Sequence, residues 1–209
     1  GLDTTSTSCS GTCDGQATVS SISGGTGGYT YLWNTTPGQT TITATGLCNG
    51  NYCVTVTDGN GCQDSSCIDL SSPNPLLVTT ASVDALCNGN PSGKAIANVT
   101  GGNPPYTYLW NDPLVQATDT AINLLAGTYC VSVTDANGCF DPTTCVIVSQ
   151  PSTLSLTTDS TDISCFGLCD GQAVATQTGG TATYTYLWND PMAQTSDTAT
   201  ALCIGTYQV

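Results

Sequence analysis

Thirteen cysteines are the side chains of this 209-residue chain whose type and spacing could do chemistry. A cysteine can act as a nucleophile, ligate a metal ion or form one half of a disulfide. The paired C-x-x-C spacing of a zinc site occurs nowhere in the sequence, and so dense a set of cysteines is typical of an oxidising compartment. We therefore predict disulfides and an extracellular location, with reduced metal ligands as the alternative.

The rest of the composition argues against catalysis and against nucleic-acid binding. The chain has no His, Arg or Glu, its single Lys is Lys94, and its formal net charge is -14. General acid–base and nucleophilic catalysis need such groups as activating partners, and a nucleic-acid backbone needs cations. We predict that the protein is not an enzyme, binds no nucleic acid and needs no cofactor. Because no run of about 20 apolar residues occurs, we also predict no membrane span.

The cysteines belong to a sequence unit that is repeated nearly three times. Cys9, Cys87 and Cys165 follow one another at spacings of 78 and 78 residues, and each is followed by a Tyr-Thr-Tyr-Leu-Trp-Asn segment. A repeat of this length indicates a tandem array of similar domains. We predict three copies that meet at Pro-bearing joints: a first copy over residues 1–72 without its N-terminal strand, a complete second copy over 73–150, and a C-terminally truncated third copy over 151–209.

Each copy has the pattern of a set of short β-strands. Residues 94–100 and 129–134 alternate apolar and polar side chains, as half-buried strands do. Asp58–Gly61 and Asp135–Gly138 have the composition of hairpin turns. Six or seven such strands in each copy predict an all-β fold of tandem immunoglobulin-like β-sandwich repeats, stapled by disulfides because each core is small.

Comparison of the copies predicts one kind of disulfide. Two cysteines of the first copy, Cys13 and Cys48, align with Cys169 and Cys203 of the third copy. In the second copy both cysteines are lost together, because Pro91 and Leu125 stand there. Since bonded partners are expected to be lost as a pair, we predict the bridges Cys13–Cys48 and Cys169–Cys203.

The remaining pairs are predicted from the hairpins and by what is left over. Cys53 and Cys67 are equidistant from the centre of the first hairpin turn, which places them opposite each other on neighbouring strands. Cys130 and Cys145 occupy the matching hairpin of the second copy. When these pairs are set aside, the cysteines that remain in the first two copies lead us to predict the bridges Cys9–Cys62 and Cys87–Cys139. Cys165 has no partner left, so we expect its partner to lie beyond Val209.

Two further patterns each have a structural and a ligand-binding interpretation. The Tyr-x-Tyr-x-Trp stripe is either a core strand or an exposed platform for sugars, and we favour the core because three exposed rings would form a large apolar patch. Aspartates in turns and loops are either turn formers or Ca²⁺ ligands. We favour turn formers, because no fixed ligand set recurs among the copies. These aspartates are Asp58, Asp112, Asp119, Asp135, Asp190 and Asp197.

The ordered motifs of the second copy resemble the SprB repeat of Bacteroidota surface proteins. They are Gly102, the segment from Pro105 to Trp110, the segment from Ala126 to Tyr129, and the segment from Val133 to Cys139. The first copy departs from the pattern at Gly28, which stands where the second copy has Pro105. The resemblance implies a very long, filamentous cell-surface protein exported by type IX secretion, of the kind that includes the mobile adhesin of gliding motility.

The same resemblance implies O-glycans on hydroxyls that follow an aspartate. The hydroxyls that fit the motif are Thr4, Thr120, Ser160 and Thr198. We expect a non-catalytic structural and adhesive stalk, whose partners are adjacent repeats of the same chain, neighbouring filament chains or surface polysaccharide. The alternatives are a subunit of a self-assembling extracellular fibre or sheath, and a carbohydrate-binding surface module.

Overall fold

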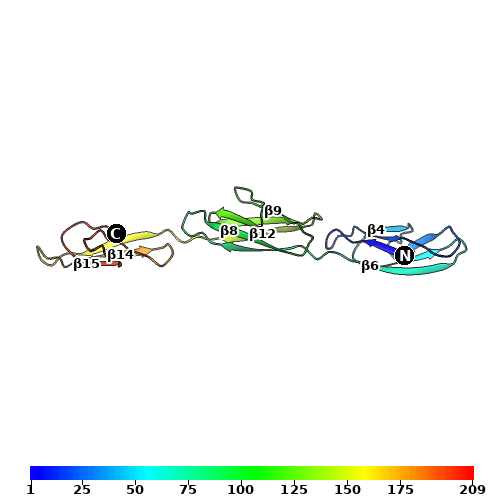
Figure 1. The fold of residues 1–209 in the computed structure, drawn as a ribbon, viewed down its shortest axis with the longest axis horizontal. Helices are drawn as coiled ribbons and strands as arrows, with labels where there is room; N and C mark the ends of the chain where they lie inside the picture. Colours follow the sequence, from blue (N-terminus) through cyan, green and yellow to red (C-terminus); the bar gives the residue numbers. More distant parts are fainter. The chain divides into compact units, whose positions relative to one another are not determined.

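A computed structural model describes all 209 residues, and every regular element in it is a β-strand (Figure 1). The first copy forms two antiparallel sheets, ordered β1-β2-β4 and β3-β5-β6. Its strands are β1 (Leu2–Thr5), β2 (Gly15–Val19), β3 (Thr30–Trp33), β4 (Thr43–Leu47), β5 (Gly50–Thr57) and β6 (Gln63–Leu70).

The second copy repeats this strand order and the third repeats part of it. The second copy has sheets ordered β10-β8-β7 and β12-β11-β9. These strands are β7 (Leu77–Val83), β8 (Gly93–Thr100), β9 (Thr107–Trp110), β10 (Thr120–Leu124), β11 (Gly127–Thr134) and β12 (Phe140–Val148). The third copy has one sheet, ordered β13-β14-β15. Its strands are β13 (Ser155–Thr161), β14 (Gly171–Thr178) and β15 (Thr198–Leu202).

The expected all-β fold is confirmed, and its core follows from alternation along the strands. In β2, Gly15, Ala17 and Val19 are buried while the residues between them face outward. Trp33 from β3 and Leu70 from β6 join Ala17, Val19, Ala44, Leu47 and Val54 in one hydrophobic cluster, so side chains from both sheets fill the same core. The third copy has an equivalent cluster around Trp188. Each copy therefore buries one tryptophan, and the three tryptophans are only 1–2% exposed.

A bulge at the end of β4 brings that strand back toward the start of β2. The register shifts between Gly15 and Gln16, and Gly46 on the opposite strand has a φ of +69°. Glycine adopts this left-handed conformation without strain. Asn123 and Ala201 occupy the equivalent positions with φ of +57° and +56°. The bulge lets Leu47 turn into the core and places the residue after it, Cys48, beside the chain that leads into β2.

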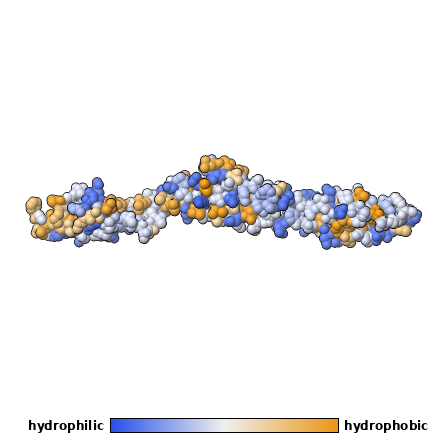
Figure 2. Space-filling view, viewed as in Figure 1, coloured by the Kyte–Doolittle hydropathy of each residue, from blue (hydrophilic) through white to orange (hydrophobic).

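Contacts between Cα atoms group the residues into two compact units. One comprises Gly1–Ala81, Ile96–Asp119 and Cys130–Cys145, and the other comprises Ser82–Ala95, Thr120–Tyr129 and Val146–Val209. These units do not coincide with the three copies, whose boundaries therefore stay a prediction from the repeat pattern. No helix in the structure is long and apolar enough to cross a membrane. On the face shown in Figure 2, hydrophobic residues form scattered patches among hydrophilic ones.

Candidate functional site

Ten of the cysteines form five disulfides, and two of these bridges cross hairpins. Cys53 lies directly opposite Cys67 in the register of β5 and β6, and their Cα atoms are 4.0 Å apart. Cys130 and Cys145 are joined across the equivalent hairpin of the second copy, also with a Cα separation of 4.0 Å. These are the partners that the turn positions predict. Each bridge ties a copy's central hairpin together.

Two further bridges close the bulged end of the first sheet in the copies that have them. The Cys13–Cys48 and Cys169–Cys203 bridges each have a Cα separation of 3.9 Å. Cys48 directly follows β4, and Cys203 directly follows β15. These are again the partners that the comparison of the copies predicts. In each pair, one cysteine precedes the start of a strand (β2 or β14) and the other follows the end of its neighbour (β4 or β15).

The fifth bridge differs from the prediction, because it joins cysteines of two consecutive copies. Cys9 of the first copy is bonded to Cys139 of the second, with a Cα separation of 5.6 Å and a sequence separation of 130 residues. The predicted pairs Cys9–Cys62 and Cys87–Cys139 are therefore wrong. Cys62, Cys87 and Cys165 are free and exposed in the structure.

The two cysteines that were expected to pair within the first copy lie at opposite ends of it. Cys62 follows the hairpin turn and precedes β6, whereas Cys9 lies near the far end of that strand, since Thr7 N donates to Ser71 O at 3.4 Å. The strand between them has eight residues, which at ~3.3 Å per residue separates its ends by about 23 Å. A disulfide needs Cα atoms within about 7 Å. Cys9 and Cys62 therefore cannot pair with each other in this structure.

Cys9 and Cys139 meet because each lies on the side of its copy that faces the joint. Cys9 begins a short turn, here called the start turn, whose neighbour Ser71 is the residue where the chain leaves the first copy. Cys139 follows the hairpin turn of the second copy. That turn lies beside the segment where the chain enters, since Asp135 accepts from Asn103 N at 2.8 Å and Gly102 N donates to Asn74 O at 3.0 Å. The two sulfurs therefore meet at the joint, where the chain leaves the first copy and enters the second.

A hydrogen bond next to this disulfide supports the same contact. The Asn137 side-chain amide donates to the Ser8 carbonyl at 3.0 Å. Asn137 belongs to the hairpin turn of the second copy, and Ser8 directly precedes Cys9. We call Cys9, Cys87 and Cys165 the start cysteines, and Cys62 and Cys139 the turn cysteines. The Cys9–Cys139 bond is the inter-copy bridge.

Aspartates of the hairpin turns accept hydrogen bonds from the turn backbone. Asp58 accepts from the backbone N–H groups of Thr26, Asn60 and Cys62 at 2.8–3.0 Å. The Thr26 N–H, followed by that of Cys62, lowers the pKa of Asp58 to about 2 because both favour the charged form. In the second copy Asp135 accepts from Asn103, Asn137 and Cys139 at the same places. These carboxylates hold the turn cysteines in position.

A second set of carboxylates organises the loop after each tryptophan. Asp112 is 3% exposed and accepts from Leu114 N, Gln116 N and the Gln116 side chain at 2.9–3.0 Å. Burial works to raise its pKa, but hydrogen bonds, those of Gln116 foremost, lower it overall. Asp190 makes the same contacts in the third copy, and in the first copy the Thr35 hydroxyl accepts from the corresponding N–H at 2.9 Å. No group of three Cys or Asp side chains is placed to hold a metal ion.

The aromatic stripe is part of the core, as we favoured. Trp33, Trp110 and Trp188 are almost fully buried, and their indole N–H groups donate to backbone carbonyls at 2.9 Å. The flanking tyrosines are half-buried. No three-ring platform is exposed for sugars, which removes the observation on which the carbohydrate-binding alternative depended.

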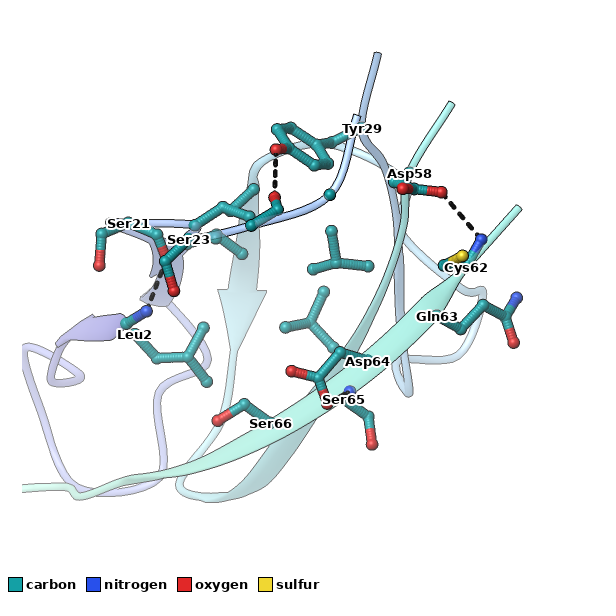
Figure 3. Close-up of a pocket in the computed structure, with 17 residues that line it drawn as sticks. Leu2, Ser21, Ser23, Tyr29, Asp58, Cys62, Gln63, Asp64, Ser65 and Ser66 are labelled. Atoms are coloured by element: carbon teal, nitrogen blue, oxygen red, sulfur yellow. Dashed lines mark hydrogen bonds between the residues drawn. The ribbon is translucent and has the colours of Figure 1, made fainter. Parts of the chain in front are cut away.

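A groove of about 300 Å³ in the first copy (Figure 3) is lined by residues that include Leu2, Gly25, Tyr29 and Cys62. In the second copy the counterpart of Gly25 is Gly102, which donates its N–H to Asn74 O. In the third copy, Gly180 N likewise donates to Ser152 O at 2.8 Å. In those copies the segment that enters from the joint occupies this position. The groove of the first copy thus corresponds to a position that a segment of the chain occupies in the other two copies.

The predicted O-glycosylation residues differ in exposure. Thr4 in β1 and Ser160 in β13 are exposed, whereas Thr120 and Thr198 are half-buried at the starts of β10 and β15. The Thr198 hydroxyl also donates to Asp197 at 3.0 Å. Thr4 and Ser160 are thus the two accessible positions.

Disulfide-stapled copies in tandem define a repeat protein of immunoglobulin-like, all-β fold. The SprB repeat matches the chain three times, at residues 1–40, 79–115 and 157–193, which together make up just over half of it. The chain therefore belongs to the SprB repeat family, as the motifs suggested. No curated protein matches the chain.

Three solved structures match the chain, with different coverage and similarity. The three N-terminal domains of the bacteriophage RB49 highly immunogenic outer capsid protein (Hoc) match with a TM-score of 0.53 at 15% identity, covering 90% of this chain and 73% of that one. A tetra-tandem repeat from the extending region of a large adhesion protein matches at 0.25 and 13% identity, with 99% and 64% covered. The amphioxus IgVJ-C2 molecule matches at 0.30 and 15% identity, with 71% and 96% covered. The Hoc likeness supports the fold alone.

Proposed function

We propose that these copies form a non-catalytic stalk of a cell-surface protein, which carries a distal surface away from the cell and transmits force along its length. The observation that carries the proposal is the inter-copy bridge between Cys9 and Cys139. A bridge inside a copy stabilises that copy's fold. A bridge between consecutive copies restricts the joint itself, which is of use where many copies act as one mechanical element.

The chemistry of the joint supports the transmission of force. A peptide linker alone leaves neighbouring domains free to reorient, which is the default for small interfaces. Here a second covalent connection spans the same joint, and it is accompanied by the contact between Asn137 and Ser8. Force that enters near Cys9 can reach Cys139 through one disulfide. The fold of the residues between them is then shielded from tension.

The location and export that we propose follow from the family and the disulfides. SprB repeats are found in cell-surface proteins, and five disulfides suit an oxidising location outside the cell. We propose type IX export and O-glycans at the exposed residues Thr4 and Ser160. An intact mass of native protein equal to that of the bare polypeptide would remove the glycan proposal.

The test of the stalk is a set of in-frame deletions in the organism that makes the protein. Removing whole 78-residue copies, cut at equivalent positions so that every joint is preserved, should lower the height of a distal epitope above the cell surface. Immunogold electron microscopy measures that height, and the decrease should be proportional to the number of copies removed. A height that does not depend on copy number would overturn the proposal. As a matched control, substituting exposed Leu32 by Ala in one copy should leave the height unchanged.

A further inference from the structure

We propose that the three free cysteines are halves of further inter-copy bridges: each start cysteine bonds the turn cysteine of the next copy, and Cys62 bonds a start cysteine of a preceding copy. The inference deepens the proposed stalk and rests on it for its mechanical meaning. Its chemistry is tested separately, because bond connectivity does not depend on what the protein does at the surface.

The free turn cysteine is held in the same geometry as the bonded one. Cys139 N donates to Asp135 Oδ1 at 2.9 Å, and its carbonyl accepts from Asp135 N at 2.9 Å. Cys62 N donates to Asp58 Oδ1 at 2.8 Å, and its carbonyl accepts from Asp58 N at 2.9 Å. The sulfur of Cys62 is thus presented on the same turn as that of Cys139, and it is exposed.

The free start cysteines also share the geometry of the bonded one. The carbonyl of Cys9 accepts from the N–H of the residue three positions later at 3.3 Å, and those of Cys87 and Cys165 do the same at 3.2 and 3.1 Å. Each therefore opens the same start turn. Three independent copies of one turn, of which one is already bonded, make the other two candidates for the same bond.

The start turn of the second copy also lies beside the exit to the third. Gly89 N donates to the Gln150 side chain at 2.8 Å, and the Asn88 amide donates to Pro151 O at 3.0 Å. Gln150 and Pro151 form the joint that leads into the third copy. Cys87 is therefore placed at its joint as Cys9 is placed at the preceding one.

Large apolar side chains next to two of the free cysteines are exposed. Leu86 precedes Cys87 and is 74% exposed, and Phe166 follows Cys165 and is 98% exposed. On the entry side, Cys62 lies at the edge of the groove that the incoming segment occupies in the other copies (Figure 3). Asn60 is in the same turn as Cys62, and it is the counterpart of Asn137, which donates to the Ser8 carbonyl. Both halves of the joint are thus present on this chain.

Each bond forms by thiol–disulfide exchange with an oxidised dithiol protein of the compartment. The thiolate of one cysteine attacks that protein's disulfide and releases one of its sulfurs as a thiolate. The thiolate of the second cysteine then attacks the mixed disulfide, which closes the inter-copy bridge and releases the oxidant as a dithiol. Two protons and two electrons leave the repeat protein for each bridge.

A bridge at every joint would give the array a short covalent route. Force that reaches Cys139 through one bridge would need to travel only to Cys165, 26 residues further on, before the next bridge carried it into the following copy. Most of each copy would lie outside this route. The array would then resist extension even when individual copies unfold.

The experiment is a disulfide map of the protein isolated from its producing cells, alkylated without reduction and cleaved before aspartates. This cleavage places Cys87 in the peptide 84–111 and Cys62 in the peptide 58–63. We expect peptide 84–111 to be linked to a turn peptide of the following copy that begins Asp-x-x-Gly-Cys, and peptide 58–63 to be linked to a start-turn peptide. The link between the peptides of Cys9 and Cys139 is the internal reference.

Alkylated Cys62 and Cys87, or bonds between two start cysteines or two turn cysteines, would overturn the inference. An electrophoretic comparison without reductant then distinguishes the source of the partner. A protein that migrates as one chain has bridges within one polypeptide, and a covalent ladder of chains has them between polypeptides. The first outcome supports bridges between consecutive copies of one array, and a covalent ladder would overturn that assignment of the partner. The stalk can fail its own height test while this map succeeds, and the reverse also holds.

Discussion

Replacing Cys9 and Cys139 together by serine should change how far the chain stretches under force. Force applied to the two ends follows the shortest covalent route, and the inter-copy bridge lets it pass directly from residue 9 to residue 139. The residues between them carry no tension while the bridge is intact. Without the bridge, the same residues become part of the route.

The difference in length follows from the disulfide positions. In the unmodified chain the route crosses the bridges Cys9–Cys139 and Cys169–Cys203, and the remaining roughly 45 residues extend to about 15 nm at ~3.4 Å per residue. In the C9S/C139S variant it instead crosses the bridges Cys13–Cys48, Cys53–Cys67, Cys130–Cys145 and Cys169–Cys203. That route contains roughly 110 residues and extends to about 37 nm. The variant should therefore be about 22 nm longer.

Single-molecule force spectroscopy with handles at both termini measures this contour length in buffer without reductant. The matched control is C53S/C67S, which removes a bridge that lies wholly inside the shielded segment and should leave the contour length unchanged. Equal lengths for C9S/C139S and the unmodified chain would refute the reasoning. An increase in the C53S/C67S control would show that force passes through the first copy.

Three further predictions concern the turns and the core. W33A should lower the free energy of unfolding of the first copy by about 3–5 kcal/mol, because it empties a buried indole site. The control L32A, on the exposed side of the same strand, should lower it by less than ~0.5 kcal/mol. Hydrogen exchange in β2 and β5 measures the stability of both variants. Because Asp58 has a pKa of about 2 against an ordinary 3.8, its contribution to stability should be complete above pH 3.8 and be lost as the pH falls toward 2. Thermal unfolding of D58N should lack this part of the pH dependence, whereas a control D3N should retain it. D112A should destabilise the second copy by about 1–3 kcal/mol, because it leaves buried N–H groups unpaired. D112T should lose less stability in chemical denaturation, because the first copy has threonine at this position. Equal losses of stability for the two variants would contradict this.

Local patterns were enough to predict the hairpin and sheet-end bridges. Cys53 and Cys67 sit symmetrically about a turn whose Asp-Gly-Asn-Gly sequence sets the register of the strands beside it, so sequence distance determines spatial distance there. The joint loss of two cysteines at Pro91 and Leu125 revealed the second kind of bridge without any geometry. The burial of Trp33 also followed from alternation and from the cost of exposing a large apolar patch.

The partner of Cys9 could not be predicted in this way. Pairing by elimination requires that a copy satisfies its own cysteines, whereas the length of β6 separates Cys62 from the start turn. One signal was available in the sequence: the odd number of cysteines already required at least one cysteine without a partner in this chain. That signal applies equally to every start cysteine.

The sequence by itself determined the repeat, the all-β strands, the core tryptophan of each copy and the bridges whose partners are neighbours on adjacent strands. These features depend on periodicity and turn chemistry, which act over a few residues or recur at a fixed spacing. Only the tertiary structure decided that Cys9 bonds Cys139. That bond depends on which end of a copy each turn occupies, and the ends are set by strand direction and by where the chain enters and leaves the sandwich.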